Sequence, residues 1–171
     1  LYGEAVLQHY LIGLTEPEYR DELARKYCEH KLQSTFGVAM EALASKLGLT
    51  IIQSKVWYEP IFASKPIKSK SLGRLINEGL SIGHTEYTAF ETAEGVNIST
   101  KFVEALSAAE EVSSLIWEFE GEPPIKFVVD ELDGEAITCA AAVNRFHDVV
   151  EATAGFVTCD RLPNVRLAYN D

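Results

Sequence analysis

The sequence lacks most of the features that mark a specialised class of protein. Its 171 residues include only three cysteines, Cys28, Cys139 and Cys159, and no CxxC pair. A disulfide framework or a cysteine-based metal site is therefore not expected. No apolar run reaches the ~18–20 residues that span a bilayer, and the first residues have no basic segment or cleavage site typical of a signal peptide. These absences predict a cytoplasmic protein with reduced thiols and no membrane segment.

Signatures of nucleotide binding and catalysis are also missing. The chain contains no GxGxxG, GxxxxGK[ST], HExxH or GxSxG motif. It does contain His84-Thr85-Glu86, and in a strand the first and third of these side chains share a face, about 7 Å apart. His84 and Glu86 are therefore candidates for a metal ligand with an acid or base beside it. Zinc nucleobase deaminases combine such an H-x-E with a downstream P-C-x-x-C, which this chain lacks, so that family is excluded.

Charge is abundant and unevenly divided. The net charge is −11. Residues 1–75 hold ten basic against eight acidic side chains, whereas residues 76–171 hold five against eighteen. A short basic segment stands out because no acid interrupts it, and it contains Lys65, Lys68, Lys70 and Arg74. It is either a solvated loop or a contact for an anion or an acidic partner. The excess of acids excludes sequence-specific recognition of nucleic acid.

Helical patterns fill about the first 48 residues. Thr15 and Glu18 have the spacing of a capping box, in which each side chain satisfies a backbone amide at the start of a helix. Ser34 or Thr35 is a candidate N-cap for a later helix, and Gly48 suits the position after its last turn. The expected helices cover residues 4–12, 16 to about 33, and 36–47, with one bent helix over 16–47 as the alternative.

The remaining residues are expected to form a mostly antiparallel sheet and one long helix. Apolar residues recur at helical spacing from about 100 to 119, and Gly121 and Pro123 follow. Asp133-Gly134 is typical of a tight hairpin turn between two strands. The expected strands cover residues 49–58, 84–92, 125–131, 135–143, 155–160 and 164–169, and a short helix covers 72–78.

These patterns together predict one α+β domain over residues 1–171, with a helical front over about 1–48 and the sheet and long helix over about 49–171. We expect a non-catalytic binding protein whose partner is another protein or a second copy of the chain, with neither cofactor nor metal. The expected contact residues are Lys65, Lys68, Lys70, Arg74, Glu110, Glu111 and Trp117. The alternatives are a small metal-assisted enzyme centred on His84 and Glu86, and a small-ligand pocket between the sheet and the long helix.

Overall fold

The computed structural model describes residues 10–29, 34, 36–69, 72–106 and 113–164, and it combines helices with antiparallel sheets. The predicted α+β class is confirmed. Contacts between residues divide the chain into two compact units, residues 1–109 and residues 110–171, and each unit is described by itself. A single domain over all 171 residues stays a prediction.

Two helices precede the sheet of the first unit, α2 (Glu16–Glu29) and α3 (Gly37–Lys46). The Thr15 amide donates to Glu18 Oε2 at 2.8 Å, as a capping box requires. Gly48 has a φ of +72° and follows the end of α3, where glycine is favoured. The two helices are separate, so the alternative of one bent helix over 16–47 is wrong.

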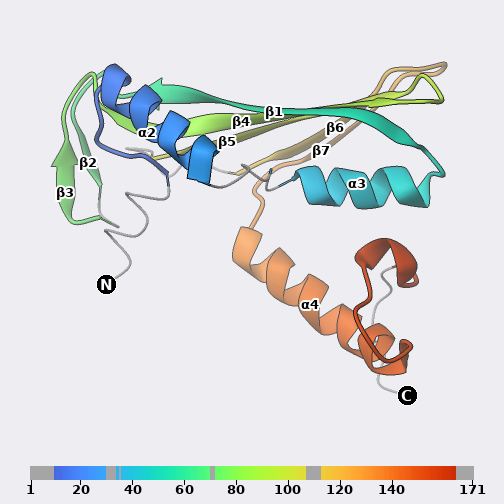
Figure 1. Ribbon diagram of the computed structural model, residues 1–171. Helices are drawn as coiled ribbons and strands as arrows, with labels where there is room; N and C mark the ends of the chain where they lie inside the picture. The colour runs from blue at the N-terminus through green and yellow to red at the C-terminus, as the bar shows by residue number, and fades with distance from the viewer. Residues whose placement is uncertain (1–9, 30–33, 35, 70–71, 107–112, 165–171) are drawn as a thin grey trace. The chain divides into compact units, whose positions relative to one another are not determined.

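Three long strands form the main sheet, β1 (Ile51–Phe62), β4 (Ser81–Thr92) and β5 (Asn97–Ala105). They pair antiparallel in the order β1-β4-β5, and Figure 1 shows them running side by side. The strands predicted at 49–58 and 84–92 are confirmed as β1 and β4. Because β4 is central, its backbone hydrogen bonds are satisfied on both edges. Every even-numbered residue of β4 from Ile82 to Thr92 is buried, so one face of this strand is covered along its whole length.

A short ribbon of β2 (Ile67–Ser69) and β3 (Arg74–Ile76) completes the first unit. Residues 74–76 are therefore a strand, and the helix predicted over 72–78 is wrong. Ile67 and Ile76 pair across the ribbon and are both buried. They belong to an apolar core made of Ile12, Ala63, Ile67, Ile76 and Ile82.

The second unit contains a hairpin and the long helix. β6 (Leu115–Phe119) pairs antiparallel with β7 (Ile125–Val129), and α4 (Gly134–Glu151) and the 3₁₀ turn η1 (Cys159–Arg161) follow. Among the residues that the structure describes, no helix is both long enough and apolar enough to cross a membrane.

The long helix was predicted in the wrong place. Residues 97–105 form β5 and residues 115–119 form β6, so a helix over 100–119 is excluded. Burial alternates residue by residue along β5, which is the period of a strand. Nine residues of β5 pair with β4. The hydrogen bonds of this pairing stabilise the strand, although the spacing of the apolar residues would also fit a helix. The long helix lies instead at residues 134–151.

The hairpin predicted around Asp133-Gly134 is also wrong. Asp133 is the N-cap of α4, and its side chain accepts a hydrogen bond from the Ala136 amide at 2.9 Å. Aspartate followed by glycine suits a tight turn and a helix start equally well, and the alanines that follow favour the helix. The strand predicted at 155–160 is absent, whereas the predicted helix at 4–12 and strand at 164–169 lie mostly outside the described residues.

Replacing Asp133 by alanine is expected to cost about 1 kcal/mol of helix stability, because the cap hydrogen bond is lost. Hydrogen exchange at the Ala136 amide measures this loss directly. Asp130→Ala is the matched control, because Asp130 is an exposed acid just before the helix. Equal exchange rates in the two variants would show that the cap contributes nothing.

Candidate functional site

Polar side chains gather on the covered face of the β1-β4-β5 sheet. His84, Glu86 and Thr88 alternate along β4 and are all buried, with Glu86 only 2% exposed. Alternation along a strand places all three on one face. Burying polar groups is costly unless they form hydrogen bonds, so the elements that cover this face must supply partners.

Glu86 accepts a hydrogen bond on each of its carboxylate oxygens. The Ser34 hydroxyl donates to Oε1 at 2.5 Å, and the Tyr58 hydroxyl donates to Oε2 at 3.1 Å. Tyr58 lies on β1 directly opposite Glu86. An ionised carboxylate only accepts hydrogen bonds, so these two donors fit a charged Glu86 held in a fixed orientation.

Ser34 connects this carboxylate to α3 and to the next residue along the same face of β4. Its Oγ accepts from the Gly37 amide at 2.7 Å and from the Thr88 hydroxyl at 2.6 Å. Phe36 occupies the N-cap position of α3 and makes no side-chain cap. The prediction of Ser34 as the N-cap is therefore wrong, although Ser34 Oγ accepts a hydrogen bond from the first amide of the helix.

A second carboxylate, Glu104, lies beside His84. The two residues face each other across β4 and β5, and His84 Nε2 is 3.8 Å from Glu104 Oε2. The side chain of Glu104 is 26% exposed and that of His84 is 10% exposed. Burial raises the pKa of Glu104, a hydrogen bond from Tyr10 lowers it, and the charge of Glu86 raises it. The charge of Glu86 is therefore close enough to disfavour the ionised form of Glu104.

Aromatic rings surround His84. The Tyr58 ring meets the imidazole edge-on with centroids 5.1 Å apart, and the Tyr10 ring lies 5.9 Å away. Tyr10 is held there because the adjoining segment is anchored to β4, where the Ser81 hydroxyl donates to the Leu11 carbonyl at 2.5 Å. Burial raises the pKa of Tyr10, and Glu104 raises it further.

We refer to these residues as the Glu86 cluster, which comprises Tyr10, Ser34, Tyr58, His84, Glu86, Thr88 and Glu104. When both carboxylates are ionised, the cluster is negative even if His84 is protonated. A small cation that donates hydrogen bonds, such as an ammonium group, complements this charge. The cluster includes both catalytic candidates from the sequence, His84 and Glu86, and the structure adds the other five residues.

The predicted contact residues lie elsewhere. Lys65, Lys68 and Arg74 are exposed on the β2-β3 ribbon and the turn before it. Trp117 is half-buried on β6 and stacks on Phe119, with ring centroids 6.2 Å apart. The remaining three, Lys70, Glu110 and Glu111, lie outside the described residues. A binding role for any of these residues stays a prediction.

A metal site is not formed by the described residues. No group of three or more His, Cys, Asp or Glu side chains is placed there to hold a metal ion. The predicted metal-assisted enzyme centred on His84 and Glu86 therefore has no ligand set in this part of the chain.

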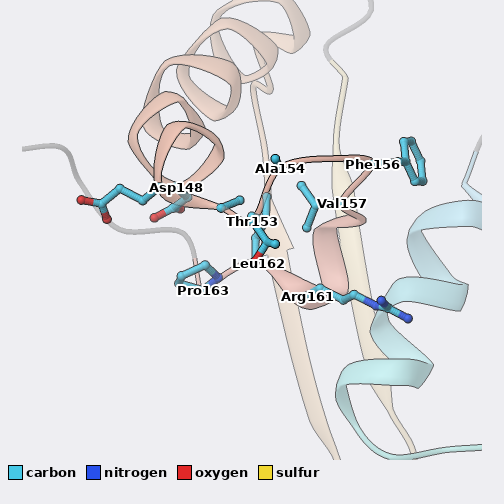
Figure 2. A pocket seen from close by; sticks show the side chains of 10 residues that line it. Asp148, Thr153, Ala154, Phe156, Val157, Arg161, Leu162 and Pro163 are labelled. Atoms are coloured by element: carbon cyan, nitrogen blue, oxygen red, sulfur yellow. The ribbon is translucent and has the colours of Figure 1, made fainter.

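A pocket lies in the second unit, where α4 ends. Figure 2 shows Asp148, Phe156 and Arg161 among the side chains around it. Asp148 is buried, and its Oδ2 lies 3.3 Å from Arg145 Nη1. The same nitrogen donates to the Pro163 carbonyl. Arg145 therefore links the helix to the C-terminal loop through these two contacts.

Comparison with known proteins adds a family and a fold. A family model described as the 2,4-diaminopentanoate dehydrogenase C-terminal domain matches residues 1–171. Among solved structures, an amine dehydrogenase from Mycobacterium smegmatis matches with a TM-score of 0.82 and 28% sequence identity. That match covers 97% of this chain and 48% of the other, so the chain spans about half the length of that enzyme. A comparison with curated proteins gives no significant match.

These matches overturn the predicted function. Both the family and the solved structure are dehydrogenases, so the prediction of a non-catalytic protein-binding protein is wrong. The prediction failed because it relied on short local motifs and the charge distribution. The Glu86 cluster is assembled from residues far apart in the sequence, so no local motif could indicate it.

Proposed function

Because the chain belongs to the 2,4-diaminopentanoate dehydrogenase C-terminal domain family, we propose that it forms the substrate-binding part of a dehydrogenase that oxidises a primary amine. The family description names a diamino acid, and the similar solved structure is an amine dehydrogenase. The chemical group common to both is the amine. The proposal therefore concerns this group and leaves the rest of the substrate open.

The observation that carries the proposal is the pair of carboxylates, Glu86 and Glu104, beside His84. The charge of Glu86 raises the pKa of Glu104, which indicates repulsion between the two groups. An alkylammonium ion between them relieves this repulsion and donates a charge-assisted hydrogen bond to each. Glu104 is the more exposed of the two, so the substrate meets it first. Partial exclusion of water strengthens the attraction.

The same residues can move the proton that the reaction requires. Oxidation of a primary amine removes a hydride from carbon and a proton from nitrogen, and hydrolysis of the resulting C=N bond releases ammonia and a carbonyl compound. An ammonium ion must lose a proton before its carbon gives up a hydride. A base with a raised pKa is better suited to accept that proton near neutral pH. Glu104 has such a pKa, and His84 Nε2 lies 3.8 Å from it.

The dinucleotide that would accept the hydride has to be bound outside the described residues. A dinucleotide is usually bound by a parallel strand-helix-strand unit with a glycine-rich turn. In the described part of the chain every strand pairing is antiparallel, and the sequence has no GxGxxG motif. These residues do not fit a dinucleotide, and we propose that other residues of the intact protein bind it. A cytoplasmic location and a second copy of the chain as a partner also stay predictions.

The test is an assay of the intact protein with oxidised nicotinamide dinucleotides and a series of primary amines. We expect amine-dependent formation of the reduced nicotinamide, followed by its absorbance. Alcohols of matched carbon skeleton are the control, because they carry no ammonium group for the carboxylates. An enzyme that reduces the dinucleotide with none of the amines, or equally fast with the alcohols, would refute the proposal.

A further inference from the structure

We infer that Ser34 is a positioning residue that fixes the orientation of Glu86, and that the absence of a side chain at Gly37 allows it to do so. The importance of Glu86 for amine oxidation rests on the proposed function. The geometry that links Ser34, Gly37 and Glu86 does not depend on it.

The direction of each hydrogen bond at Ser34 follows from counting donors and acceptors. A serine hydroxyl has one hydrogen to donate and two lone pairs to accept with. The Gly37 amide can only donate, and it occupies one lone pair at 2.7 Å. The Thr88 hydroxyl donates to the other at 2.6 Å. The single hydrogen of Ser34 is then directed to Glu86 Oε1, 2.5 Å away.

This arrangement uses the full bonding capacity of the Ser34 hydroxyl. Two of its partners belong to rigid elements, since Gly37 is the first residue of α3 and Thr88 lies in the central strand β4. A hydroxyl held at three points cannot rotate away from Glu86. Ser34 thus transmits the rigidity of α3 and β4 to the carboxylate.

Gly37 is required for steric reasons. A Cβ atom at this position would lie 2.7 Å from Ser34 Cβ and 3.0 Å from Ser34 Oγ. Real Cβ atoms essentially never approach within 3.0 Å, so even alanine would displace Ser34. Gly37 is also the first residue of a regular helix, where its backbone conformation suits any residue. The site therefore requires the space that glycine leaves.

The neighbouring strand provides a matched control. Thr100 lies on β5 directly opposite Thr88. Its Oγ1 is buried and has no hydrogen-bond partner among the described residues. Thr100→Val and Thr88→Val thus remove the same group from the same face of the sheet. Only Thr88→Val removes a hydrogen bond from Ser34.

The first measurement is steady-state kinetics of the intact protein with a primary amine. Ser34→Ala and Gly37→Ala are each expected to lower kcat/KM about 10- to 100-fold, since a buried hydrogen bond to a charged group is lost. The decrease should come mainly from a higher KM, because a misplaced Glu86 weakens substrate binding. Partial unfolding would instead lower the apparent kcat at constant KM. Thr88→Val should have a smaller effect in the same direction, and Thr100→Val should match the wild type.

The second measurement is a crystal structure of the Ser34→Ala and Thr100→Val proteins. We expect Glu86 to leave its contact with Tyr58 in the first variant and to keep it in the second. An unmoved Glu86 in Ser34→Ala, or equal kinetic losses in Ser34→Ala and Thr100→Val, would overturn the positioning role. If the wild type oxidises no amine, the proposed function fails, and the crystal structures still decide the role of Ser34.

Discussion

Glu104→Gln is expected to lower kcat/KM for primary amines about 100-fold, the largest effect on activity of any conservative change in the Glu86 cluster. Glutamine keeps the size of the side chain and one oxygen acceptor but removes the charge that attracts the ammonium ion. Loss of one member of a largely desolvated charge pair costs roughly 2–5 kcal/mol, and about 1.4 kcal/mol corresponds to a factor of ten. Initial rates over a range of amine concentrations measure the effect.

The pH dependence of this variant is a sharper test than its rate at one pH. Burial holds the pKa of Glu104 above its usual value of 4.5, and only the ionised form attracts an ammonium ion. In the wild type, kcat/KM should therefore rise as the pH increases through this raised pKa. Glu104→Gln should lack that rise. Glu91→Gln is the control, because Glu91 is an exposed residue of β4 and its loss should leave the profile unchanged. A Glu104→Gln profile identical to that of the wild type would contradict the assignment.

The same raised pKa has a defined consequence for stability. The folded state holds a proton on Glu104 more tightly than the unfolded state does. Between the usual value of 4.5 and the raised value, folding therefore binds a proton, and the contribution of Glu104 to stability decreases as the pH rises. This decrease should be absent in Glu104→Gln.

Gly83→Ala is expected to cause the largest loss of stability, about 4 kcal/mol or more. Gly83 has a φ of +152°, and a Cβ there would lie 2.0 Å from the Glu104 carbonyl oxygen and 2.7 Å from Ala105 Cα. Both are backbone atoms of β5, so no side chain can turn aside to make room. The ladder between β4 and β5 must open beside the pair of His84 and Glu104. Urea unfolding measures the loss, and amine oxidation should decline with it.

Gly95→Ala separates this clash from strain in the backbone. Gly95 also has a positive φ, +79°, but no atom lies within 4 Å of a Cβ built there. Its replacement should cost only the strain of a left-handed conformation, about 1–2 kcal/mol. Equal unfolding free energies for the two variants would show that contact with β5 is unimportant.

Where local chemistry admits one structure, the sequence was sufficient to predict it. The capping box at Thr15 and Glu18 begins α2, and Gly48 follows α3. Alternation through residues 84–92 predicted a strand with His84 and Glu86 on one face, and β4 has this arrangement. In each case the decisive residues lie within a few positions of one another, so the signal is local.

Where local chemistry admits two structures, the prediction failed. Residues 97–105 have apolar positions that fit either a helix or a strand. They form a strand because they pair with β4. Asp133-Gly134 fits either a hairpin turn or a helix start. It begins a helix, in which the Asp133 side chain accepts a hydrogen bond from the Ala136 amide. The helix predicted over 100–119 included Glu104, which lies instead on β5 and faces His84.

The sequence by itself therefore determined the α+β class, α2, α3, β1 and β4, and the presence of His84 and Glu86 on one face. Only the tertiary structure decided which residues join them. Ser34 and Glu86 are 52 residues apart, and Tyr58 and Glu86 are 28 apart. No local pattern encodes such contacts, because they form only when separate elements pack against one sheet. The dehydrogenase chemistry that we propose depends on those long-range contacts. For that reason, no short sequence motif indicates this function.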